Sequence, residues 1–157
     1  MSAAPFPSAT PDETELLLRW LAFLRGAVLR KATGIDDEQA RWQPDGRLIP
    51  LIGIVNHLTG VEARWIDGEM RGAQVGKPDD EYTPGPGLTI EDAIRRYEQR
   101  AAATDATVRE LADLTTASRA GDGTDLRFIL LHLINETARH AGHADAVREL
   151  LDGTVGE

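Results

Sequence analysis

The sequence predicts an all-α protein, a four-helix bundle formed by one domain over residues 1–157. Apolar residues recur at three- and four-residue spacings in four long segments, which is the period of an amphipathic helix. No segment alternates apolar and polar residues as a strand does, and there is no internal repeat. A length of 157 residues suits a single core, and without cysteine no disulfide can stabilise it. Because no strand is predicted, the helices must bury one another's apolar faces.

The first helix is predicted over residues 11–33. Thr10 can cap its first turn, Pro11 takes the first helical position, and Glu13 completes a capping box. Gly34 is a suitable terminator. The apolar face of this helix comprises Leu17, Trp20, Leu24, Ala27 and Val28.

A short acidic helical turn is predicted over residues 36–41, and a second long helix over residues 48–70, ending before Gly72. The apolar face of the second helix comprises Leu51, Ile54, Leu58, Val61 and Trp65. Residues 73–88 are rich in proline and glycine, which predicts a long loop. A loop of this length in a small domain is typically functional or mobile, and we expect it to cross over one end of the bundle.

The third and fourth helices complete the predicted bundle. Thr89 begins the third, because its hydroxyl can cap the helix and Asp92 follows three residues later. Apolar residues then step by four and three as far as Leu111. The fourth and longest helix is predicted over residues 124–152, with Gly153 as its stop.

Charge and composition restrict the expected partners. The chain has 17 lysines and arginines against 26 acidic residues, and its net charge of -9 repels nucleic acid and anionic membranes. No apolar run approaches the length that spans a bilayer. A small molecule or another protein is therefore the expected partner. Residues 1–9, expected to be a flexible N-terminus, have no signal-peptide pattern, which predicts a cytoplasmic location.

The fourth predicted helix has ionisable residues in its apolar seam. The spacing that places Ile129 and Leu133 on the buried face also places Glu136, His140 and His143 there. Burying an ionised carboxylate is costly unless something compensates it. Glu136 and His140 are one turn apart, so both side chains can direct a donor atom at one cation.

His57 offers a third donor from the second predicted helix. Its neighbours one turn away are Gly53 and Gly60, which indicate either a close helix contact or room for a ligand. Each candidate alone has a common structural explanation, but His57, Glu136 and His140 all fall on or beside inward faces of the bundle. Two imidazoles and a carboxylate suit a divalent metal such as zinc, nickel or iron, with positions left for water or substrate.

Four further residues flank the predicted site. His132 and His143 each lie one turn from a predicted ligand, and each is a candidate fourth ligand, ligand partner or proton carrier. His143, which lies in the seam, is the candidate catalytic residue. Arg139 and Arg148 are candidate cofactor-binding residues because a guanidinium grips a carboxylate bidentately, although an arginine on a solvated helix face is the commoner case.

Two stretches of the sequence resemble the DinB-like superfamily. They are residues 50–65, PLIGIVNHLTGVEARW, and residues 135–145, NETARHAGHAD. Within the superfamily the similarity is closest to the mycothiol S-transferase group, which residues 21–34 and 37–40 also fit. The resemblance implies a four-helix bundle of the DinB/YfiT-like kind.

The resemblance also implies a metal site. In such proteins the metal is held by a histidine of the second helix and by two residues one turn apart on the last helix, and these positions match His57, Glu136 and His140. Many members have histidine where this chain has Glu136. A carboxylate there resembles the site of the mycothiol-dependent maleylpyruvate isomerase, which favours the thiol-using branch.

The activity implied by the resemblance is metal-dependent thiol S-transfer. A divalent metal, zinc or nickel foremost, would hold mycothiol or a similar low-molecular-weight thiol as the thiolate for attack on a small electrophile. Because the chain has no cysteine, the sulfur must come from this cosubstrate. His143 or a water molecule would carry protons, and a homodimer is expected.

Two other functions stay open from the sequence. One is a hydrolase or isomerase that uses metal-bound water and needs no thiol. The other is a non-catalytic helical module for metal binding or dimerisation, which unchanged function after loss of the metal ligands would support.

Overall fold

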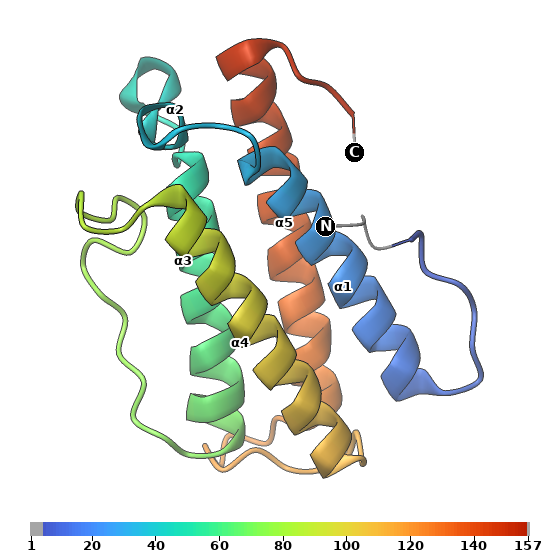
Figure 1. Cartoon of the computed structure of the whole chain (residues 1–157). Helices are drawn as coiled ribbons and strands as arrows, with labels where there is room; N and C mark the ends of the chain where they lie inside the picture. The colour runs from blue at the N-terminus through green and yellow to red at the C-terminus, as the bar shows by residue number, and fades with distance from the viewer. Residues whose placement is uncertain (1–4, 157) are drawn as a thin grey trace.

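The computed structural model describes residues 5–156, in which no strand occurs beyond an isolated β-bridge between Ala117 and Asp125. The long helices lie side by side (Figure 1). These are α1 (Glu13–Ala32), α3 (Leu51–Glu62), α4 (Ile90–Leu111) and α5 (Leu126–Asp152). The shorter elements are α2 (Asp37–Arg41), a 3-10 turn η1 (Pro44–Gly46) and η2 (Ala63–Met70), a π-helical continuation of α3. The prediction of an all-α fold is confirmed.

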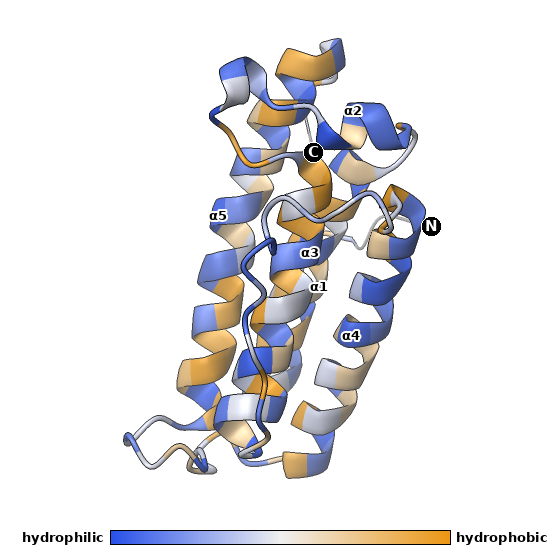
Figure 2. Ribbon diagram, turned by 90° about the vertical axis from the view of Figure 1, so that its left-hand side faces the viewer, coloured by the Kyte–Doolittle hydropathy of each residue, from blue (hydrophilic) through white to orange (hydrophobic). Residues whose placement is uncertain are grey.

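The direction of the helices determines the path of the longest loop. Figure 1 shows α3 and α4 running in the same direction, with α1 and α5 running opposite to them. The chain must therefore return along the length of the bundle between η2 and α4. Residues 71–89, which we call the crossover loop, make this return alongside α3 on the face that Figure 2 presents. The expectation that residues 73–88 cross over one end of the bundle is wrong, because parallel neighbours need a lengthwise connection.

Aspartate caps set the starts of two helices. The helix α1 begins two residues later than predicted, since Asp12 and not Thr10 accepts a hydrogen bond from the amide of Glu15, at 3.1 Å. The helix α5 also begins two residues later than predicted, since Asp125 accepts from the amide of Phe128 at 2.8 Å. Aspartate is the stronger N-cap, which explains why both helices start after it and not after the nearby threonine.

Other boundaries follow from backbone chemistry. The helix α3 begins at Leu51 and not at residue 48, because Pro50 disfavours the helical conformation of the residue before it. Thr89 caps α4 as predicted, and Gly153, with φ of 77°, ends α5 as predicted. None of the described helices is both long and apolar enough to cross a membrane.

The core consists of two apolar clusters with polar residues between them. One cluster includes Leu51, Ile54, Tyr97 and Val147, and the other includes Leu21, Ile66, Ile129 and Leu133. On α5 the buried apolar residues stop at Leu133 and resume at Ala141, and the interval contains Glu136 and His140. Figure 2 shows hydrophobic and hydrophilic residues alternating along the helices. The predicted metal ligands therefore lie at mid-height in the bundle.

A buried ion pair links α1 to α3. Arg25 of α1 binds both carboxylate oxygens of Glu62 of α3 at 2.8 Å, and its third nitrogen binds Asp105 of α4 at 2.8 Å. The side chains of Arg25 and Glu62 are only 5% and 2% exposed. A bidentate guanidinium–carboxylate pair satisfies most of the polar atoms that are buried here. Together with Asp105, this pair joins α1, α3 and α4.

Candidate metal centre

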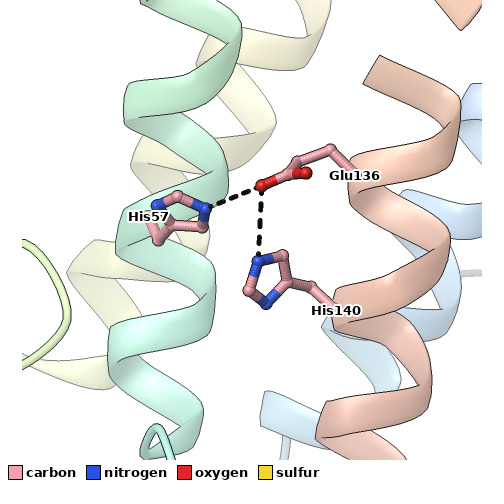
Figure 3. A group of neighbouring side chains, drawn as sticks. All are labelled: His57, Glu136 and His140. Atoms are coloured by element: carbon pink, nitrogen blue, oxygen red, sulfur yellow. Dashed lines mark hydrogen bonds and ion pairs between the residues drawn. The ribbon is translucent and has the colours of Figure 1, made fainter. Parts of the chain in front are cut away.

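The structure brings together the three side chains that the sequence predicts as metal ligands. Figure 3 shows His57 of α3 facing Glu136 and His140 of α5 across the space between the two helices. One donor atom from each residue lies within 4.8 Å of the other two. Oε1 of Glu136 is 3.3 Å from Nε2 of His57 and 3.6 Å from Nε2 of His140. That these residues bind a metal stays a prediction.

The distances and the donor chemistry fit a small divalent cation. A tetrahedral zinc ion with bonds of about 2.0 Å would hold its ligand atoms about 3.3 Å apart. An imidazole lone pair and a carboxylate oxygen repel each other unless a proton or a cation lies between them. Nδ1 of His140 is buried and has no hydrogen-bond partner among the described residues, whereas Nε2 of the same ring faces Glu136. Two imidazoles and one carboxylate also leave coordination positions for a substrate.

Electrostatics favour the ligand form of both α5 side chains. Burial opposes ionisation of Glu136, but its interactions with His57 and His140 outweigh the effect of burial and lower the pKa of this carboxyl. Burial also lowers the pKa of His140, and the nearby charges of His57, His143 and Arg139 lower it further against the opposing effect of Glu136. A carboxylate and a neutral imidazole are the forms that bind metals.

A carboxylate that the sequence pattern does not predict lies behind His57. Glu81 of the crossover loop accepts a hydrogen bond from Nδ1 of His57 and is only 2% exposed. Both Glu81 oxygens also bind Arg64 of η2, at 2.6 and 3.0 Å. Burial opposes ionisation of Glu81, but the hydrogen bonds from Arg64 and His57 lower its pKa. The ring of Tyr82 lies 4.6 Å from that of His57, so the loop covers the imidazole as well as binding it.

Two glycines were the signal in the sequence for this loop contact. A Cβ added to Gly53 would lie 1.9 Å from the carbonyl oxygen of Tyr82, and one added to Gly60 would lie 3.1 Å from Oε2 of Glu81. The sequence offered either a close helix contact or ligand space as the reason for these glycines. The structure shows a close contact made by the crossover loop and not by a helix.

Gly53→Ala is expected to displace the loop. The new methyl group overlaps a backbone oxygen that cannot rotate away, so we expect a loss of about 1–3 kcal/mol in the free energy of unfolding in urea. Gly142→Ala is the matched control, because this glycine of α5 has no atom within 4 Å of an added Cβ. That variant should gain up to about 1 kcal/mol from helix propensity. Equal midpoints for the two variants would contradict the packing described.

The two other histidines take different positions beside the site. The ring of His143 is stacked 6.1 Å from that of His140 and is half-buried. The ring of His132 lies 4.3 Å from that of Trp65, and its charge contributes to lowering the pKa of Glu136. The catalytic role of His143 stays a prediction.

The predicted cofactor-binding arginines lie apart from each other. Arg139 is exposed on the α5 turn between Glu136 and His140. Arg148 donates to the carbonyl oxygens of Lys31 and Thr33, both at 2.9 Å, and so satisfies the C-terminal end of α1. The structure therefore places only Arg139 within a turn of the predicted ligands, and a cofactor-binding role for either arginine stays a prediction.

Comparison with known proteins identifies the family of the chain. No curated protein matches the chain. The mycothiol-S-transferase family profile matches residues 16–153, which include every residue of the predicted metal site and the crossover loop. This match covers most of the 157 residues and confirms the resemblance noted from the sequence. The chain belongs to the mycothiol-S-transferase family.

Proposed function

We propose that the protein is a metal-dependent S-transferase that activates mycothiol or a similar low-molecular-weight thiol for attack on a small electrophile. The observation that supports this proposal most is the meeting of His57, Glu136 and His140 within 4.8 Å in a chain of this family. A divalent ion bound there, zinc or nickel foremost, would lower the pKa of a thiol beside it to the range in which the thiolate predominates.

The residues of the chain hold and orient the reacting groups. His57 is fixed on α3, and Glu136 and His140 are fixed on α5, so the geometry of the donors depends on two packed helices and not on a loop. The lowered pKa values of Glu136 and His140 keep both residues in the ligand form at neutral pH. Three donors would leave at least one coordination position of the ion for the thiol.

The proton released by the thiol needs an acceptor. We assign this role to His143, which is half-buried one turn beyond His140 and stacked on its ring. The sulfur then forms its bond to the electrophile, and a displaced group leaves with the bonding electrons. Arg139 is exposed on the adjoining turn, where its guanidinium can bind a polar group of the cosubstrate. To bind the cosubstrate, Arg148 would first have to break its hydrogen bonds to the carbonyl groups at the end of α1.

Thioether formation tests the proposal directly. We expect the protein to couple a thiol to chlorodinitrobenzene only when both metal and thiol are present, and to lose this activity in chelator and regain it with zinc or nickel. His143→Gln should keep its metal but react about 100-fold more slowly, because proton transfer by a positioned side chain contributes about that much.

Three other outcomes would contradict the proposal. Turnover of an ester or a similar substrate with metal but without thiol would indicate a hydrolase that uses bound water. Metal binding without any turnover would indicate a non-catalytic module. A His143→Gln variant as fast as the wild type would show that His143 does not accept the proton released by the thiol. The expected homodimer and cytoplasmic location stay predictions.

A further inference from the structure

Both ring nitrogens of His57 face carboxylates, and one of the two carboxylates belongs to the crossover loop. Nδ1 faces Glu81 and Nε2 faces Glu136. An ionised carboxylate accepts hydrogen bonds and cannot donate them, so when a cation lies between Nε2 and Glu136, the proton of the neutral ring is on Nδ1, where Glu81 accepts it. The lone pair of that ring is then on Nε2, the atom that faces Glu136 and His140.

We propose that Glu81 is a positioning residue of the metal centre, which holds His57 in the tautomer and orientation that present Nε2 to the cation. This inference rests on the proposed metal function of the same site. Histidine ligands usually donate their second nitrogen to a carboxylate or a carbonyl group, and that contact fixes the ring and raises its basicity. Glu81 supplies the contact from a loop far from both ligand-bearing helices in sequence.

Arg64 keeps the Glu81 carboxylate charged and fixed. Its two terminal nitrogens bind the two Glu81 oxygens at 2.6 and 3.0 Å, in the fork geometry that orients a carboxylate rigidly. The Glu81 side chain is almost fully buried, so without Arg64 its charge would be strongly disfavoured. Arg64 lies on η2, and π-helical segments are frequent at functional sites.

The backbone of the loop is fastened at the same point. Nδ2 of Asn56 donates to the carbonyl oxygen of Glu81 at 2.8 Å, and the Glu81 amide closes a turn onto Pro78 at 3.2 Å. The glycines at positions 53 and 60 let this segment approach α3 closely, as the added-Cβ distances show. Glu81 is thus held by side-chain and main-chain contacts together, as a residue that must orient another one requires.

Metal titration of purified variants tests the role of Glu81. We would titrate zinc and cobalt against a chelating indicator for the wild type, Glu81→Ala and Glu81→Gln, and record the cobalt absorption spectrum of each. Glu81→Ala should bind both ions about 10- to 100-fold more weakly, the usual effect of removing the partner of a ligand. Glu81→Gln keeps an acceptor for Nδ1 of His57 and should lose less. The cobalt spectrum should change in Glu81→Ala, because the imidazole is no longer held in one orientation.

Arg41→Ala is the matched control for loosening of the loop. Arg41 binds the carbonyl oxygens of Pro84 at 2.8 Å and Gly85 at 2.9 Å, in the same loop but away from His57. We expect this variant to be less stable in urea and to bind metal as the wild type does. An equal loss of affinity in Arg41→Ala and Glu81→Ala would overturn the inference, because loop order and not the carboxylate would then matter.

The two proposals fail in different ways. If the wild type binds neither zinc nor cobalt, the metal centre is wrong and the role of Glu81 is wrong with it. If the wild type binds metal and folded Glu81→Ala binds it equally tightly with the same cobalt spectrum, the metal centre stands and only the positioning role is overturned.

Discussion

Glu136→Ala is expected to remove both the bound metal and the thiol-transfer activity. Glu136 is the residue whose oxygen faces both imidazoles, at 3.3 and 3.6 Å, so its loss leaves two neutral donors with no charge to attract a cation. Metal content measured on the purified protein should fall from about one ion per chain to a small fraction. Thioether formation should fall about 100-fold or more, since a bound metal contributes several kcal/mol to such reactions.

His132→Ala is the matched control for Glu136→Ala. His132 lies one turn before Glu136 on the same helix, but its ring contacts Trp65 and it does not belong to the three-residue group. The variant should keep its metal, whereas His57→Ala and His140→Ala should lose most of it. A metal loss in His132→Ala as large as that in His140→Ala would show that the ligands are assigned wrongly.

The largest effect on stability is expected from Arg25→Met. This change leaves the carboxylate of Glu62 buried without its guanidinium partner, and breaking a buried pair in this way costs about 3–5 kcal/mol. Urea unfolding followed by circular dichroism would measure the cost. The double variant Arg25→Met with Glu62→Leu should recover most of it, because two apolar side chains need no partner.

An exposed pair provides the comparison for the buried one. Arg127 and Glu13 join α5 to α1 at 2.8 Å with the same fork geometry, but both side chains face solvent. Arg127→Met should therefore leave the unfolding midpoint almost unchanged. If Arg25→Met were equally mild, the polar residues between the two apolar clusters would not be needed to join α1, α3 and α4.

The helices and the meeting of His57, Glu136 and His140 could be predicted because both depend on local spacing. Glu136 and His140 share a face wherever a helix forms over them, and the apolar residues around them predict that this face is turned inward. His57 is placed in the same way on α3. The caps could be predicted less well, because Thr10 competes with a better acceptor two residues later at Asp12.

The rest of the site could not be predicted because it depends on how the helices are arranged. Glu81 reaches His57 only because α3 and α4 run in the same direction, which forces the loop between them back along α3. Arg25 and Glu62 are charged residues on helices, where charge usually faces water, and only the packing of three helices shows that they bind each other. Helical periodicity also gives no sign that the end of α3 continues as a π-helix.

Metal analysis of the wild-type protein tests the metal centre most directly. Untagged protein purified without chelator would be measured by elemental analysis, and then titrated with zinc and nickel after dialysis. We predict about one divalent ion per chain, bound again at the same stoichiometry when the metal is returned. Folded protein that carries no metal and binds neither ion when it is added would contradict the metal centre and the S-transferase function that depends on it.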